Sequence, residues 1–188
     1  MSEQTTVQPV AGLPGPMSVL VDWALSTKAF KRSKVRPSAK VLAAALCNSG
    51  YSYREVAAMV GGMSHVAARD AYFSMLTSLR EDVKRYRRAV AVDGCDFRAS
   101  GKSFHVWLAR DIDSGEIMDF SASPTVSAED GARFLSKVAS MCTNSPFLRL
   151  GCGENAPRGL SNLDLYFQPP AGLSLIGRLG RLIMGTRE

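Results

Sequence analysis

One carboxylate stands out in this sequence because it interrupts an apolar stretch. Asp93 follows Ala89-Val90-Ala91-Val92, a run whose small and β-branched residues predict a strand. Burial of a carboxylate costs several kcal/mol unless the group is paired, hydrogen-bonded or bound to a metal ion. We therefore expect Asp93 either to face solvent at a sheet edge or to belong to a functional site.

The cysteines and histidines lack the spacing of a zinc site. No two cysteines form a Cys-x-x-Cys pair, no Cys-x-x-His pair occurs, and only two histidines could add an imidazole ligand. Buried free thiols in a reducing cytoplasm explain the cysteines better than a zinc site does. The residues concerned are Cys47, Cys95, Cys142, Cys152, His65 and His105.

Positive charge is concentrated in two short stretches of the chain. The net charge is +6, from 23 basic and 17 acidic residues. The first stretch contains no acidic residue and comprises Lys28, Lys31, Arg32, Lys34, Arg36 and Lys40. The second comprises Lys84, Arg85, Arg87 and Arg88. Clustered positive charge is typical of a phosphate-binding surface, and an ordinary solvated surface is the alternative.

Nothing in the sequence predicts association with a membrane. The first residues lack a charged and then apolar leader, and no apolar run reaches the roughly 20 residues that a membrane span needs. The chain is therefore expected in the cytoplasm, without a membrane partner.

Three short helices are predicted between positions 38 and 87. Ser38 is expected to cap the first helix, and Ser52 with Glu55 forms a capping box for the second. Gly61-Gly62 ends the second helix, and Ser64 caps a third helix with a continuous apolar stripe. This order is typical of a DNA-binding helix-turn-helix, and a three-helix bundle without a ligand is the alternative.

The third of these helices is expected to lie in the major groove of DNA, where its N-terminal residues would contact base edges. Arg69 can form two hydrogen bonds with guanine, and Ser64 and His65 can contact bases or phosphates. Basic residues before the first helix and on the second are expected to bind the DNA backbone. They are Lys31, Arg32, Lys34, Arg36 and Arg54.

The pattern changes near position 88 from helices to strands. Strands are predicted at 88–98, 103–110 and 116–123. Their short connections imply antiparallel neighbours, and a helix capped by Ser127 and a short strand at Phe147–Leu150 follow. The order strand–strand–strand–helix–strand, with Asp93 on the first strand, is that with which the ribonuclease H-like fold begins. An α/β (α+β) fold with an incomplete ribonuclease H-like mixed sheet is therefore predicted.

Several short sequence motifs accompany Asp93. They are Gly101-Lys102, Phe104-His105-Val106-Trp107, Asp111-Ile112-Asp113-Ser114-Gly115 and Ala132-Arg133-Phe134-Leu135, with Gly50-Tyr51-Ser52-Tyr53-Arg54-Glu55-Val56 upstream. As a set they resemble the DDE transposases of bacterial and archaeal insertion sequences, whose integrase-like catalytic domain follows a helix-turn-helix. The resemblance covers about residues 43–160. It implies double-stranded DNA, at transposon ends, as the partner and is compatible with a homodimer.

The resemblance also implies three carboxylates that hold two ions, Mg²⁺ or Mn²⁺, at the scissile phosphodiester. Asp93 matches the first carboxylate and is the implied catalytic and metal-binding residue. Cys152 stands near the place of the second, although a thiol is a poor ligand for Mg²⁺, and Glu154 is the alternative metal ligand. Asp96 and Asp111 are better explained as surface acids beside turns. No later segment resembles the helix that bears the third carboxylate.

Four segments follow from these patterns. They are an N-terminal arm and basic segment at 1–37, a helix-turn-helix domain at 38–87, the front half of a ribonuclease H-like DDE catalytic domain at 88–168, and a divergent tail at 169–188. The leading hypothesis is a DNA-binding transposase that is truncated or catalytically incomplete. The alternative is a DNA-binding regulator or remnant that uses the helix-turn-helix without catalysis.

Overall fold

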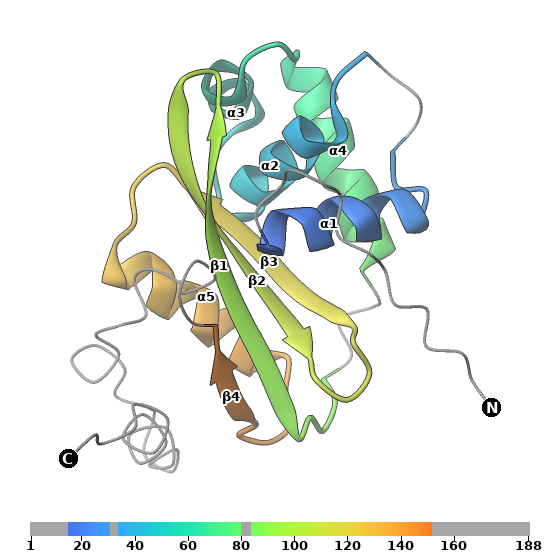
Figure 1. Cartoon of the computed structure of the whole chain (residues 1–188), viewed down its shortest axis with the longest axis vertical. Helices are drawn as coiled ribbons and strands as arrows, with labels where there is room; N and C mark the ends of the chain where they lie inside the picture. Colours follow the sequence, from blue (N-terminus) through green and yellow to red (C-terminus); the bar gives the residue numbers. More distant parts are fainter. Residues whose placement is uncertain (1–14, 31–33, 80–83, 152–188) are drawn as a thin grey trace.

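The structure, a computed structural model, describes residues 15–30, 34–79 and 84–151. Four helices come first in the chain and a small sheet with one further helix comes after them (Figure 1). The elements are α1 (Gly15–Ser26), α2 (Pro37–Asn48), α3 (Tyr53–Val60), α4 (His65–Ser78), β1 (Ala89–Ala99), β2 (Lys102–Asp111), β3 (Ile117–Ser123), α5 (Ala128–Ser140) and β4 (Phe147–Leu150). None of the helices in these segments is long and apolar enough to cross a membrane.

The four strands form one mixed sheet in the order β3-β2-β1-β4. β1 and β2 are antiparallel and so are β2 and β3, whereas β4 lies parallel to β1 after the crossover through α5. Ser100 and Gly101 join β1 to β2, and both have positive φ, 48° and 76°. Two such residues suit the right-handed twist of a tight hairpin. The predicted α+β class with a mixed sheet is confirmed.

Each face of the sheet is covered by a different set of helices (Figure 1). Side chains alternate along each strand, so Val106 and Leu108 face one side while Trp107 and Ala109 face the other. The first face packs against α1–α4, and the second packs against α5 through residues such as Phe134. One hydrophobic core therefore joins the helices before position 88 to the strands after it.

The hydrogen bonds at the end of α2 fasten it to the edge of the sheet. Ser49 Oγ donates to the carbonyl of Ala122 at 2.7 Å and accepts from its backbone nitrogen at 3.0 Å. Asn48 Nδ2 donates to the carbonyl of Phe120 at 2.5 Å. These bonds satisfy backbone groups on the outer side of β3, which is the edge strand of the sheet within the described residues.

Three of the predicted helix caps are confirmed and one is wrong. The confirmed caps are those at Ser52, Ser64 and Ser127. The predicted cap at Ser38 is wrong because the cap position is two residues earlier, at Arg36, which makes no side-chain hydrogen bond there, and α2 begins at Pro37. Proline is common at the first position of a helix, because the backbone N–H that it lacks would have no intrahelical partner there.

Candidate nucleic-acid interface

Helices α3 and α4 are joined by a short turn, residues 61–64, and α2 packs against both. Gly61 and Gly62 have φ of +68° and +64°, a conformation that side chains with a Cβ rarely adopt. A Cβ at Gly61 would also lie 2.5 Å from Ser100 Oγ. Ser64 then starts α4, since its Oγ accepts a hydrogen bond from the backbone nitrogen of Ala67 at 3.1 Å.

The start of α4 presents polar side chains to solvent. Ser64, His65 and Arg69, the three predicted base-contacting residues, are all exposed. Arg69 Nη2 lies 3.0 Å from Asp70 Oδ1, and both side chains are more than half exposed, at 52% and 61%. An ion pair this exposed contributes about 0–1 kcal/mol, so Arg69 can leave Asp70 for another acceptor at little cost.

The basic segment before α2 contributes exposed cations. Lys34 and Arg36 are exposed, as is Arg54 on α3, whereas Lys31 and Arg32 lie outside the described residues. Lys40 differs from the prediction, because it is only 9% exposed and its Nζ lies 5.0 Å from the centre of the Phe30 ring. Its ammonium therefore lies over the Phe30 ring, between α2 and the segment that precedes it.

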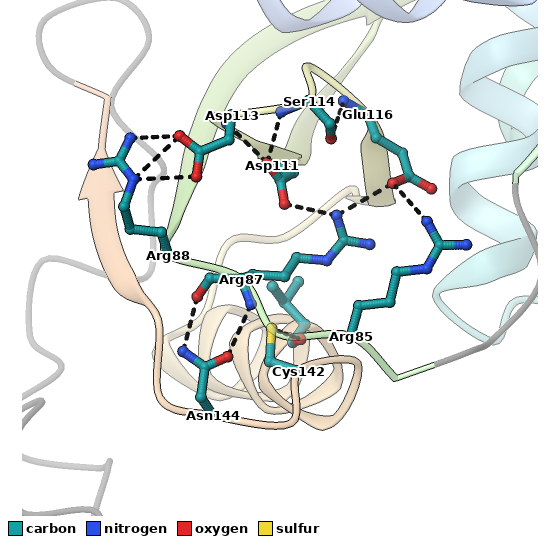
Figure 2. Close-up of polar contacts among 10 residues, drawn as sticks. Arg85, Arg87, Arg88, Asp111, Asp113, Ser114, Glu116, Cys142 and Asn144 are labelled. Atoms are coloured by element: carbon teal, nitrogen blue, oxygen red, sulfur yellow. Dashed lines mark hydrogen bonds and ion pairs between the residues drawn. The ribbon is translucent and has the colours of Figure 1, made fainter.

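Carboxylates of the fold pair with most of the second basic stretch, and Arg87 shows this most clearly. Its side chain is 9% exposed, and Nη1 lies 2.8 Å from Asp111 Oδ2 and 3.2 Å from Glu116 Oε2 (Figure 2). Its backbone nitrogen donates to Asn144 Oδ1 at 2.9 Å, and Asn144 Nδ2 donates to its carbonyl at 2.8 Å. Arg87 is thus a buried element of the fold.

Its neighbours are also paired with carboxylates of the β2–β3 turn. Arg85 Nη1 lies 3.7 Å from Glu116 Oε2, and Arg88 binds the carboxylate of Asp113 through Nε and Nη2 (Figure 2). Only Lys84 of this stretch is exposed without a carboxylate partner among the described residues. Three arginines of this stretch therefore bind the carboxylates at the end of β2 and in the β2–β3 turn.

Asp111 is buried, contrary to the prediction that it is a surface acid. Its residue is 7% exposed, and Oδ1 accepts hydrogen bonds from the backbone nitrogens of Asp113 and Ser114 at 2.8 and 2.9 Å. Burial alone would raise the pKa of Asp111, but these hydrogen bonds and the guanidinium of Arg87 hold it below its usual value. Asp96, by contrast, has a 40% exposed side chain whose Oδ1 lies 2.8 Å from Nδ1 of the buried His105.

Asp93 lies in the middle of β1 with its side chain 20% exposed, and Arg110 Nη2 is 3.1 Å from its Oδ2. The chain that leaves β4 passes beside it, because the backbone nitrogen of Gly151 donates to the carbonyl of Val92 at 2.9 Å. Glu154, the predicted second ligand, lies outside the described residues. Within residues 15–30, 34–79 and 84–151, no group of three or more His, Cys, Asp or Glu could hold a metal ion.

Asp119 on β3 is a buried carboxylate that the sequence analysis missed. Its side chain is 2% exposed, and Oδ1 accepts hydrogen bonds from Asn48 Nδ2 at 2.8 Å and Lys137 Nζ at 3.1 Å. Burial raises the pKa of Asp119, although Lys137 and Asn48 act in the opposite direction. The sequence carried a signal for it, because Asp119 interrupts an apolar strand, Ile117–Ser123, much as Asp93 does.

Comparison with known proteins gives one distant relative. No family model matches the sequence, and no solved structure matches it. The chain is 26% identical over 155 residues to the "Uncharacterized protein MJ0017" of Methanocaldococcus jannaschii, an alignment that covers 81% of this chain and 72% of that protein. The likeness extends over both the helices and the sheet, and the relative's printed name states no activity.

Proposed function

We propose that this chain is a double-stranded-DNA-binding protein in which α2–α4 form a helix-turn-helix and α4 is the recognition helix. The observation that carries the proposal is the exposed start of α4. It presents Ser64, His65 and Arg69 directly after a sharp two-glycine turn. In this motif the preceding helices hold the second helix of the pair so that its N-terminal side chains reach base edges.

Phosphate contacts are the second part of the proposal. Arg69 and Asp70 offset each other's charge, so α4 alone attracts DNA weakly. Lys34, Arg36 and Arg54 are exposed and have no ion pair within the described residues, so they can neutralise phosphates on either side of the groove. Lys31 and Arg32 come shortly before Lys34 and Arg36 in the sequence and add to the positive charge of that segment.

We further propose that the sheet is a ribonuclease H-like domain of the DDE transposase type. The strand order β3-β2-β1-β4, with β4 parallel to β1 after a helical crossover, supports this proposal. The position of Asp93 in the middle of β1 supports it as well. The protein would then be derived from an insertion-sequence transposase and would bind transposon ends.

Catalysis of strand cleavage is the second candidate function, and the hydrogen bond between Gly151 and Val92 favours it. This bond places Gly151 beside the strand that carries Asp93. Glu154, which lies outside the described residues, is the carboxylate proposed to join Asp93 in holding Mg²⁺ or Mn²⁺. The described residues do not complete such a site, because they supply one carboxylate there and Arg110 already binds it. We therefore propose DNA binding as the function of this chain, with strand cleavage as the second candidate.

The test first selects duplexes that the full chain binds from a random-sequence pool. The affinity of the full chain for the enriched, labelled duplex is then measured. Arg69→Ala removes a contact worth about 1–3 kcal/mol if the arginine pairs with a base, so affinity should fall by about fivefold to 150-fold. Arg133→Ala is the matched control, since Arg133 is also an exposed arginine with a neighbouring carboxylate partner, Glu129. Equal affinities of the two variants on the enriched sequence would refute α4 as the recognition helix.

A further inference from the structure

Two of these exposed cations, Lys34 and Arg36, meet a third, Arg98, at the tip of the β1–β2 hairpin. A groove of about 360 Å³ lies there between the segment before α2, the α3–α4 turn and the hairpin. Its lining includes Lys34 and Arg36 from the first, Gly61 and Gly62 from the second, and Arg98 from β1. Three elements that are distant in the sequence thus contribute to one concave surface.

The charge of this groove is unbalanced. Its lining contains three cationic side chains and, among the described residues, no acidic one. Lys34, Arg36 and Arg98 are exposed, and none has an ion-pair partner in the described segments. Four other exposed arginines have carboxylate partners, namely Arg69, Arg85, Arg88 and Arg133, whereas Arg54 and Arg149 have none among the described residues. Cations that converge without a counter-charge attract an anion.

The hairpin tip is also fixed relative to the α3–α4 turn. Ser100 Oγ donates a hydrogen bond to the carbonyl of Val60, the last residue of α3, at 2.5 Å. The close approach of Ser100 to Gly61, where a Cβ would come within 2.5 Å of Oγ, leaves no room for any larger residue. The backbone that carries Arg98 is therefore held beside the turn that leads into α4.

We infer that this groove binds the phosphodiester backbone next to the major groove that α4 enters, with Arg98 as a phosphate contact supplied by the sheet. The inference rests on the proposed function, because it places the contact relative to α4. A duplex presents a phosphate on each strand at every base pair, so it can meet cations that are spread over three elements. A single small anion could contact only part of such a surface.

The salt dependence of DNA binding tests this inference. The logarithm of the binding constant falls against the logarithm of the salt concentration by about 0.9 for each phosphate contact. Arg98→Ala should reduce that slope by about 0.9, and Arg98→Lys should restore most of it because the charge returns. Arg149→Ala is the matched control, since Arg149 is an exposed arginine on β4 with no ion pair among the described residues, and it should leave the slope unchanged.

The outcomes separate this inference from the proposed function. Equal slopes for Arg98→Ala, Arg149→Ala and the wild type, with Arg69→Ala still weakening binding, would overturn only the inference. Absence of DNA binding by the folded wild-type chain would overturn both. A titration with inorganic phosphate at constant ionic strength forms the last arm. Saturable phosphate binding that Arg98→Ala abolishes, together with an unchanged DNA slope, would show a small-anion site and overturn the DNA contact.

Discussion

Replacement of Arg87 by methionine tests whether the basic stretch before β1 stabilises the fold. Methionine keeps much of the apolar stem and removes the guanidinium, so Asp111, with a 9% exposed side chain, loses its buried cation. Removal of one partner of a buried ion pair costs about 3–5 kcal/mol. Asp111 keeps its two backbone hydrogen bonds, from Asp113 and Ser114, so we expect a loss near the lower limit, about 3 kcal/mol.

The adjacent residue provides a matched control. Arg88→Met makes the same chemical change one position along the chain, and the Arg88–Asp113 pair also bridges to the β2–β3 turn. Its side chains are 68% and 49% exposed, however, so water already solvates both charges. An exposed pair contributes about 0–1 kcal/mol, and Arg88→Met should cost no more than that.

The assay is equilibrium urea denaturation followed by tryptophan fluorescence, since Trp107 is buried in the sheet and reports its unfolding. The double variant Arg87→Met, Asp111→Asn should lose less than the sum of the single losses, because it leaves no unpaired buried charge. The pKa of Asp111 lies below its usual value in the folded state, so its contribution is present above the unfolded pKa and is lost as pH falls through the folded pKa. The difference between wild type and Arg87→Met should therefore shrink in acid.

Equal unfolding free energies for the Arg87 and Arg88 variants would refute a structural role for the buried pair. A DNA-binding measurement gives an independent check. Arg87 is buried, so Arg87→Met should leave the salt dependence of DNA binding unchanged wherever the variant remains folded. A lower slope in the folded variant would support the phosphate-binding role that the charge pattern suggested.

Two carboxylates yield the remaining predictions. Burial raises the folded pKa of Asp119, so its contribution to stability is complete below the unfolded pKa and is lost as pH rises through the folded pKa. The unfolding free energy of the wild type should therefore fall relative to Asp119→Asn as pH rises from below the unfolded pKa through the folded pKa, and a constant difference would contradict this. In a plasmid-nicking assay with Mg²⁺ or Mn²⁺, the wild type and Asp93→Asn should give the same rate. The reason is that Arg110 binds the Asp93 carboxylate. A metal-dependent wild-type rate above that of the variant would instead establish catalysis.

Features of the fold that depend on nearby residues were predictable from the sequence. The capping box of Ser52 and Glu55 spans three positions, and both of its hydrogen bonds are present. The strand Phe147–Leu150 was predicted with the bounds that the structure has, because Pro146 precedes it and Gly151 follows it. Local chemistry is sufficient in these cases, since the signals that begin and end each element lie beside it in the sequence, although β4 itself pairs with the distant β1.

Features that depend on distant partners were not predictable. The stretch at Arg85–Arg88 has the same local composition as a phosphate-binding surface, and only its carboxylates distinguish the two cases. Those carboxylates lie 24 residues from Arg87 at Asp111 and 29 residues away at Glu116. The Asn48–Asp119 hydrogen bond spans 71 residues. A single sequence shows charges but not which of them pair.

The same long-range contacts bear on how the candidate interface works. The apolar residues of α2 and α4, such as Leu42 and Met75, belong to the core that also contains Val106 and Leu108 of β2. A helix-turn-helix on a flexible tether could turn independently of the sheet, whereas this arrangement moves with the sheet as one body. The backbone positions of Arg98 and Arg69 are therefore fixed relative to each other. If α4 binds DNA as proposed, this constraint sets where the β1–β2 hairpin lies on the duplex, so a charge on the sheet would contribute to the register of DNA on α4.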